Sequence, residues 1–241
     1  MNRFVLMVLR NFWRIPREYG KLCHYAKYTD AYPETEKYQH IQHMLQLALG
    51  SCNVDLQVLG KEHIPQENGF MMYANHQGLF DVVAIGGTCD NPLAVVMKKE
   101  LKDAPLLKQI MQCTNSFAMD REDVRQSLTV IQNVIREVKS GRNYLIFPEG
   151  TRSKNGNTMG EFHSGSFRCA VKAQCPIVPV ALVDSYRALD QKESKPLTVY
   201  ISYLPPIAYE EYAQMNTTDL AALVKGRIRM EMDRILGQQT Q

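Results

Sequence analysis

The stretch FMMYANHQGLFDVVAIGG (residues 70–87) joins two apolar runs through a short polar segment. The first run, 70–74, is typical of a buried strand, and the run from residue 79 onward is a helix candidate. Between them lie Asn75 and His76, and Asp81 follows His76 by five residues. A core strand needs no titratable group at its end, whereas open α/β sheets place their sites where a strand ends and a helix begins. The stretch therefore predicts an α/β fold and directs attention to its polar centre.

Other short apolar segments repeat this strand pattern along the chain. We expect strands in the following ranges: 54–60, 70–74, 93–97, 117–119, 144–147, 177–183 and 197–203. Apolar residues at helical spacing predict a helix over Glu122–Lys139, preceded by Asp120 as a cap, and Thr217–Asp219 can cap a last helix that ends near Leu236. Strands that alternate with helices predict an α/β fold whose mostly parallel central sheet is flanked by helices.

The N-terminal region differs in composition from the rest of the chain. Residues 1–28 carry a net charge of +5, whereas the whole chain carries +3. Apolar and aromatic residues are interleaved with arginines over residues 4–28, which predicts one helix or a helix interrupted at Pro16, and a second helix is expected over 34–50. A basic amphipathic helix suits the surface of an anionic membrane. A helix docked on the main domain, with its arginines in solvent, would share this pattern.

Other features bear on the compartment and on the domain organisation. The longest early apolar run, residues 4–9, is far shorter than the about 20 residues of a membrane span, and no signal-peptide cleavage pattern follows it. The six cysteines form no CxxC pair, which favours reduced thiols in a cytosolic compartment. We therefore expect a peripheral, monotopic protein on the cytoplasmic face of the membrane. It would have a helical membrane-association element over 1–50, a main domain over 51–241 and no nucleic-acid partner.

His76 and Asp81 are the first candidates for chemistry. A turn between them can bring the carboxylate to one ring nitrogen of the imidazole, which fixes the tautomer and raises the basicity of the other nitrogen. His76 is therefore a candidate general base. No serine or cysteine near His76 in the sequence is a candidate nucleophile, so the histidine would act directly on a substrate hydroxyl. The alternative is a loop histidine whose hydrogen bonds are satisfied by the fold.

A second polar segment, LIFPEGTRS (145–153), follows another expected strand. Gly150 lets the backbone approach a ligand closely, and Arg152 offers the planar fork of donors that suits phosphate oxygens. The segment lacks the residue order of a P-loop, and it could also be a polar connection. Lys98 and Arg121 stand at two further strand ends. Cations at three strand ends, beside a His–Asp pair, are what a phosphate-bearing alcohol requires.

Together these segments resemble the glycerolipid acyltransferases, and among them the 1-acyl-sn-glycerol-3-phosphate acyltransferase group. Four blocks match in order over residues 55–205: Asn75-His76 with Asp81; Lys98-x-Glu100-Leu101 leading to Asp120-Arg121; Phe147 to Ser153; and Val178-Pro179-Val180, preceded by Phe162-x-x-Gly165. The HxxxxD pattern is weak alone and strong together with FPEGTRS at this distance. Residues 155–160 are expected to form a flexible loop, for which the resemblance names no role.

The resemblance implies transfer of a fatty acyl group to the free hydroxyl of lysophosphatidic acid, which gives phosphatidic acid. The donor would be a thioester, acyl-CoA or acyl carrier protein, used as a co-substrate without any cofactor. His76 would take the hydroxyl proton and Asp81 would support it, with no acyl-enzyme and no metal. The resemblance also implies a substrate phosphate site with these residues: Lys98, Arg121, Glu149, Gly150, Thr151 and Arg152. The main domain over 51–241 would then be the acyltransferase domain.

Three alternatives stay open at the level of sequence. The acceptor could be another lysophospholipid or a hydroxylated lipid, because arginines also bind phosphodiesters. His76 could act on water, as in a lipid thioesterase or phosphoesterase. The chain could also be a lipid-binding module without catalysis. The motifs do not encode the acyl chain length, the thioester carrier or the oligomeric state.

Overall fold

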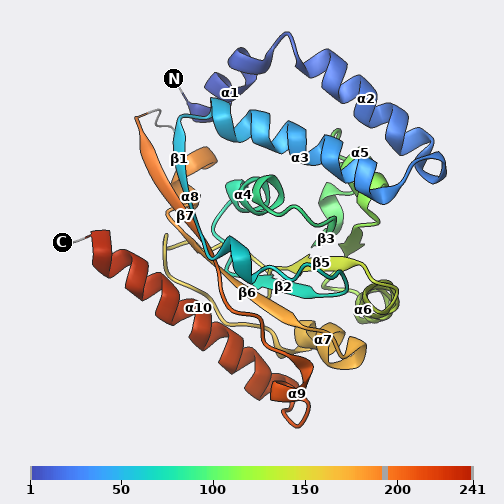
Figure 1. Ribbon diagram of the computed structural model, residues 1–241, viewed down its shortest axis with the longest axis vertical. Helices are drawn as coiled ribbons and strands as arrows, with labels where there is room; N and C mark the ends of the chain where they lie inside the picture. Colours follow the sequence, from blue (N-terminus) through green and yellow to red (C-terminus); the bar gives the residue numbers. More distant parts are fainter. Residues whose placement is uncertain (1, 192–194, 240–241) are drawn as a thin grey trace.

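The computed structural model describes residues 2–191 and 195–239 of the 241-residue chain. Within this part, seven strands form one sheet in the order β1–β7–β6–β2–β5–β3–β4 (Figure 1). The strands are β1 (Val54–Leu59), β2 (Met71–Ala74), β3 (Leu93–Lys98), β4 (Phe117–Met119), β5 (Asn143–Ile146), β6 (Ile177–Val183) and β7 (Leu197–Tyr203). Each coincides, to within one residue at either end, with a range expected from the sequence.

The strands β6, β2, β5, β3 and β4 run parallel to one another. β7 pairs antiparallel with β6, and β1 pairs parallel with β7. The prediction of a mostly parallel sheet is confirmed, and the reversed β7–β1 edge is a feature that periodicity does not reveal. Every residue of β2 and β6 is buried, as expected for central strands whose two faces are both covered by helices.

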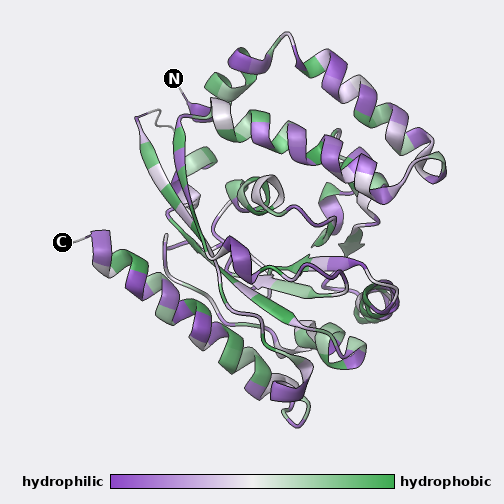
Figure 2. Cartoon of the chain, in the orientation of Figure 1, coloured by the Kyte–Doolittle hydropathy of each residue, from purple (hydrophilic) through white to green (hydrophobic). Residues whose placement is uncertain are grey.

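Helices cover both faces of the sheet. One face packs against α6 (Val124–Lys139), α7 (Arg168–Ala173) and α10 (Thr217–Gln239). The other face packs against α3 (Glu34–Ser51), α4 (Phe80–Thr88) and α8 (Tyr186–Leu189). Along β2 the side chains alternate between the two cores, with Met71 and Tyr73 on one side and Met72 and Ala74 on the other. Figure 2 shows largely hydrophobic strands between helices that carry both hydrophobic and hydrophilic residues.

The first two helices, α1 (Arg3–Asn11) and α2 (Ile15–Lys27), form an outer layer on α3 (Figure 1). The predicted interruption is confirmed. Pro16 stands in the first turn of α2, where its missing N–H removes no hydrogen bond, so it starts a second helix rather than kinking a continuous one. A small third core joins α2 and α3 to α5 (Leu107–Thr114). Over the described ranges, every helix falls short of the length or hydropathy that crossing a bilayer requires.

Short helices connect the larger elements. They are η1 (Thr29–Ala31), η2 (Lys61–His63), η3 (Lys99–Leu101), η4 (Ser164–Phe167) and α9 (Tyr209–Tyr212). Two caps differ from the sequence prediction. α6 starts at Val124, so Asp123 rather than Asp120 stands at the capping position and accepts from the first turn. Asn216, rather than Thr217–Asp219, supplies the capping oxygen of α10.

The five mutually parallel strands end at one edge of the sheet, called the carboxyl edge below. The loops that leave these strands carry His76 after β2, Glu149 after β5, Ser185 after β6 and Arg121 after β4, and Lys98 is the last residue of β3. Residues far apart in the sequence therefore gather at one edge, as is usual for sites in parallel sheets.

Candidate active site

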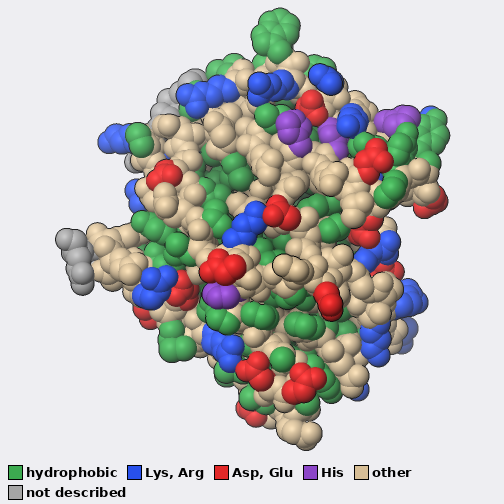
Figure 3. All heavy atoms as spheres, viewed as in Figure 1, with side chains coloured by type: hydrophobic (Ala, Val, Ile, Leu, Met, Phe, Trp, Pro, Cys, Tyr) green, Lys and Arg blue, Asp and Glu red, His purple; other side chains and the backbone are tan. Residues whose placement is uncertain are grey.

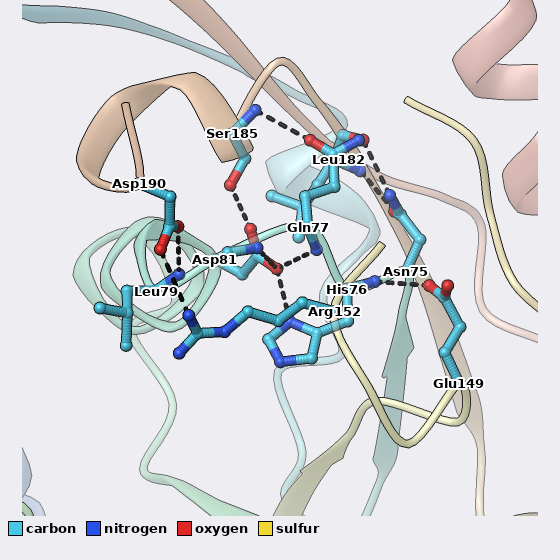
Figure 4. Close-up of polar contacts among 11 residues, drawn as sticks. Asn75, His76, Gln77, Leu79, Asp81, Glu149, Arg152, Leu182, Ser185 and Asp190 are labelled. Atoms are coloured by element: carbon cyan, nitrogen blue, oxygen red, sulfur yellow. Dashed lines mark hydrogen bonds and ion pairs between the residues drawn. The ribbon is translucent and has the colours of Figure 1, made fainter. Parts of the chain in front are cut away.

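The centre of the site is the loop that leaves β2 (Figure 4). His76 Nδ1 lies 2.7 Å from Asp81 Oδ2, and Asp81 belongs to the first turn of α4. The strand-to-helix turn thus folds the carboxylate back onto the imidazole, as the sequence predicted. An ionised carboxylate only accepts hydrogen bonds, so Nδ1 carries the proton and Nε2 is the basic nitrogen. The imidazole also stacks on Phe147, with ring centroids 4.2 Å apart.

Asp81 is fully buried, and the surrounding chain holds both of its carboxylate oxygens. Oδ2 accepts the backbone N–H groups of Gln77 at 2.6 Å and Gly78 at 3.0 Å, in addition to the imidazole. Oδ1 accepts the hydroxyl of Ser185, which is also fully buried. These hydrogen bonds compensate for the water that burial removes, and they leave the carboxylate one orientation relative to His76.

Ser185 is itself held by further hydrogen bonds. Its N–H donates to Gln77 Oε1 at 2.9 Å, and Gln77 Nε2 donates to Asn157 Oδ1 at 2.9 Å. Asn157 Nδ2 donates in turn to Asp184 Oδ1 at 3.1 Å. The network ties the loop after β2 to the loop after β6 through residues 155–160. This segment, expected to be a flexible loop, is therefore part of the polar framework of the site.

Glu149 supports the His76 loop from the end of β5. Its Oε1 accepts the N–H of His76 at 2.7 Å, and its Oε2 accepts the N–H of Gly160 at 2.6 Å. The residue is only 5% exposed, and this burial raises the pKa of Glu149, although the two backbone N–H groups favour the charged form. The sequence placed Glu149 among the phosphate ligands. Both oxygens bond to backbone donors, so in this structure the carboxylate holds the loop that carries His76.

Arg121 and Gly150 meet although they follow different strands. Gly150 has φ = +72°, a conformation that favours glycine, and a Cβ at this position would lie 3.2 Å from Nη1 of Arg121. Partial burial lowers the pKa of Arg121 from its usual value, and the Glu100 carboxylate opposes this shift. The guanidinium stays charged at any physiological pH. Two residues that the sequence grouped in a phosphate site are thus in contact range.

Arg152 reaches across the site to the segment that follows α8. Its Nη1 lies 3.2 Å from Asp190 Oδ1, and Oδ2 of the same carboxylate accepts the N–H of Leu79 at 3.1 Å. Figure 4 shows the Arg152 side chain running past the His76 imidazole toward Asp190. The side chain of Arg152 is 42% exposed, so a ligand from solvent can reach its guanidinium.

The other two residues of the predicted phosphate site are exposed to solvent. Lys98 is exposed and pairs with Glu100 at 3.1 Å, and Thr151 is exposed beside Arg152. Lys98 and Arg121 share Glu100 as an acidic neighbour. Across the residues that the structure describes, no hydrogen bond or ion pair joins Lys98 to His76 or Arg152.

Four polar residues of the site were not singled out from the sequence: Gln77, Asn157, Ser185 and Asp190. Two of them carried a usable signal, because Gln77 lies inside HxxxxD and Ser185 comes two residues after the apolar strand 177–183. Polar residues just beyond a parallel strand are expected at the site edge. Asp190 had no such signal, because α8 separates it from the strand and only packing decides where that helix points.

The chemistry available to this arrangement is proton transfer and anion binding. A His–Asp pair stands beside arginines, and all six cysteines are free thiols. In the described part of the chain, no three His, Cys, Asp or Glu side chains are grouped so that they could hold a metal ion.

Comparison with known proteins places the chain in a family. The family model "Acyltransferase" matches residues 55–183. The 1-acyl-sn-glycerol-3-phosphate acyltransferase of Saccharomyces cerevisiae is 28% identical over 190 residues, covering 77% of this chain and 61% of that protein. The Escherichia coli protein of the same name is 31% identical over 150 residues, covering 62% of this chain and 61% of that protein. The chain thus spans about three fifths of the length of these relatives.

A solved structure is similar over nearly the whole chain. The crystal structure of the 1-acyl-sn-glycerophosphate (LPA) acyltransferase from Thermotoga maritima matches with a TM-score of 0.77, covering 96% of this chain and 95% of that chain at 21% sequence identity. At this identity the likeness establishes the fold. The family match runs from β1 to the end of β6, over more than half of the chain, and includes both the HxxxxD and the FPEGTRS segments. The chain belongs to the acyltransferase family.

Proposed function

We propose that this chain transfers a fatty acyl group from an acyl thioester to the free sn-2 hydroxyl of 1-acyl-sn-glycerol 3-phosphate, giving phosphatidic acid. The observation that carries the proposal is the His76–Asp81 pair, joined at 2.7 Å at the carboxyl edge with Arg121 and Arg152 nearby. The names of the relatives support the substrate class. The site supplies the base and the cations that this substrate requires.

The arrangement suits direct transfer with general base catalysis. His76 donates its Nδ1–H to Asp81, so Nε2 can accept the proton of the acceptor hydroxyl while the hydroxyl oxygen attacks the thioester carbonyl carbon. The tetrahedral intermediate then collapses with cleavage of the C–S bond, and the imidazolium returns the proton to the departing thiolate. The C–O bond forms in the addition and the C–S bond breaks in the collapse, and no acyl-enzyme forms because the acceptor hydroxyl itself attacks the thioester. The thioester, acyl-CoA or acyl carrier protein, is a co-substrate, and no further cofactor takes part.

Arg121 and Arg152 are the proposed phosphate ligands. Guanidinium groups offer paired N–H donors that match phosphate oxygens. Arg121 lies against Gly150, and Arg152 runs past the His76 imidazole. Gly150 gives a phosphate access to the backbone, and Thr151 and Lys98 complete the rim. In this scheme Glu149, grouped with the phosphate ligands on sequence grounds, contributes by holding the His76 loop.

We further propose that α1 and α2 hold the enzyme on an anionic membrane, at its cytoplasmic face. The exposed side of α1 and the turn after it carry apolar side chains, and Trp13 in that turn is 90% exposed. Arg10, Arg14 and Arg17 are exposed among them. Figure 3 shows a hydrophobic side chain projecting where α1 meets α2, with Lys and Arg side chains beside it. An apolar cleft of about 300 Å³ lies between these helices and α3. Aromatic and basic residues together suit the membrane interface.

Acyl transfer to lysophosphatidic acid by the purified protein tests the proposal. Acyl-CoA and acyl carrier protein donors are supplied in parallel on vesicles, with His76→Ala as the catalytic control. The parent is expected to form phosphatidic acid about 10²- to 10⁴-fold faster than the variant, and the faster donor identifies the thioester carrier. A panel of phosphodiester and neutral lyso-acceptors accompanies the assay. Equal rates with and without a terminal phosphate would contradict the proposed acceptor, and donor loss without any acceptor would indicate hydrolysis.

A further inference from the structure

The guanidinium proposed to bind the acceptor phosphate is already bonded to a carboxylate. Asp190 Oδ1 lies 3.2 Å from Arg152 Nη1, and Asp190 Oδ2 accepts the N–H of Leu79 at 3.1 Å. The backbone next to this oxygen belongs to Gly78, where a Cβ would lie only 2.2 Å from Asp190 Oδ2. A side chain at residue 78 would therefore exclude the carboxylate. Arg152, Leu79 and Gly78 together form a cradle that Asp190 fills.

The cradle has the chemistry of an anion site. A guanidinium, a backbone N–H and a glycine that admits close approach are groups that hold phosphate oxygens in proteins. The N–H of Gly78 donates to Asp81 of the catalytic pair, so the cradle shares its loop with the proposed base. An anion bound here would lie beside the reacting centre. The carboxylate of Asp190 therefore stands where two oxygens of a phosphate could bind.

The ion pair between Arg152 and Asp190 can dissociate without unfolding the chain around it. Their side chains are 42% and 32% exposed, and partly solvated ion pairs are weak and easily exchanged. The chain on either side of Asp190 is nevertheless anchored. Arg3 of α1 donates to the carbonyl oxygens of Arg187 at 2.8 Å and Lys195 at 2.6 Å. The carboxylate can swing away while these anchors stay in place.

We propose that Asp190 is an internal latch on the acceptor-phosphate site, whose carboxylate fills the cradle until the phosphate of the acceptor displaces it. The identity of that acceptor rests on the proposed function. A phosphate monoester carries a charge of about −1.5 to −2 and three acceptor oxygens, against one charge and two oxygens for Asp190, so it competes effectively for Arg152. The latch weakens acceptor binding and leaves the His76–Asp81 pair untouched.

Asp190→Asn tests the latch. The amide keeps the size of the side chain and an oxygen for the N–H of Leu79, and it removes the charge that holds Arg152. With the full chain, calorimetry with glycerol 3-phosphate should show about two- to fivefold tighter binding, since exposed ion pairs contribute little. The KM for lysophosphatidic acid should fall by the same factor at unchanged kcat. The gain should disappear in an Arg152→Gln background, because both changes act on one cradle.

Asp90→Asn is the matched control. It removes another exposed carboxylate, paired with Lys61 at 2.8 Å before β3 and therefore at the opposite edge of the sheet, and it should change neither binding nor KM. Weaker binding of glycerol 3-phosphate by Asp190→Asn would show that Asp190 orients Arg152 for its ligand, and would overturn the latch. Equal binding would overturn it as well. If circular dichroism shows that the variant is unfolded, Asp190→Ser takes its place with the same expected outcomes.

The activity of the parent separates the latch from the proposed function. Phosphatidic acid formation by the parent, with unchanged binding in the Asp190 variants, refutes the latch alone. Tighter glycerol 3-phosphate binding in the variants, without acyl transfer by the parent to lysophosphatidic acid, refutes the proposed function alone.

Discussion

The carboxyl edge of the sheet and the N-terminal helix α1 differ in which side chains they bury: polar groups are buried at the carboxyl edge, and apolar groups are exposed on α1. At the carboxyl edge, Asp81 is buried and both of its oxygens accept hydrogen bonds. On α1, Arg3 and Asn11 are the buried residues, and apolar side chains such as Phe4 and Leu9 face solvent. Proton transfer needs atoms held in one geometry, which directional hydrogen bonds provide. The membrane contact proposed for α1 would need only apolar area and positive charge, and the exposed side of α1 and its flanking arginines carry both.

Replacing His76 is expected to have the largest effect, and it should affect the carboxyl edge alone. His76→Ala removes the proposed general base, and we expect kcat to fall by about 10²- to 10⁴-fold, the usual contribution of such a group. Binding to anionic vesicles should stay as in the parent, because α1 and α2 are unchanged. Phosphatidic acid formation and vesicle sedimentation measure the two effects. His43→Ala, which removes an exposed histidine on α3, is the control. Phosphatidic acid formation near the parent level in His76→Ala would place the base elsewhere, and none from either protein would favour the lipid-binding module.

Ser185→Ala tests whether the hydrogen bond from Ser185 fixes the orientation of Asp81 at the carboxyl edge. The change leaves Asp81 Oδ1 without the hydroxyl that it accepts, and a buried unsatisfied acceptor costs about 1–3 kcal/mol. We expect a lower melting temperature and roughly tenfold lower kcat, because the carboxylate loses its fixed orientation. Ser202→Ala is a matched control: it removes another buried hydroxyl, which donates to Glu231 at 2.6 Å away from the carboxyl edge. If both variants lose only stability, Ser185 has no role in positioning Asp81.

Trp13→Ala tests whether the exposed apolar side chains at the N-terminal helices bind the membrane. The side chain is 90% exposed, and its burial in the interface is expected to contribute about 1.5 kcal/mol to membrane binding. We expect about tenfold weaker binding to anionic vesicles and unchanged turnover of a soluble short-chain acceptor. Met230→Ala removes an exposed apolar side chain from α10 and should leave binding intact. Equal losses in the two variants would contradict the assignment of α1 and α2 as the membrane-facing element.

Cysteine alkylation is expected to have the smallest effect. Burial raises the pKa of Cys89, Cys169 and Cys175 to about 12, so these thiols stay protonated and unreactive near pH 7.5. Cys23 on α2 is partly exposed and should be labelled first by iodoacetamide. Because the proposed reaction has no thiol nucleophile, acyl transfer should change less than about twofold. Peptide mass spectrometry and the transfer assay measure the two outcomes. Rapid inactivation that tracks labelling of Cys169 would contradict both statements.

The strands and the His76–Asp81 pair were predictable because their signals are local. Apolar runs of four to seven residues mark β2 and β6, and the five-residue interval from His76 to Asp81 fits one turn. The caps of α6 and α10 were predicted a few residues away from their true positions. At both starts several polar residues lie close together in the sequence, and the residue at which the helix begins decides which of them stands at the capping position.

The supports of the site were less predictable, because their contacts depend on the order and register of the strands. Nothing near Glu149 in the sequence shows that its two oxygens accept the N–H groups of His76 and Gly160. The reversed β7–β1 edge has the same apolar pattern as the parallel strands, since periodicity carries no direction.

By itself the sequence determined the strand–motif–helix order around His76, the basic residues at strand ends and the basic, aromatic N-terminus. These features are carried by residues within a few positions of one another. The tertiary structure alone decided that Ser185 holds Asp81 across 104 residues and that Asp190 fills the cradle of Arg152. A hydrogen bond needs two atoms within about 3 Å. For residues so far apart, only the packed sheet and its helices bring the atoms to that distance.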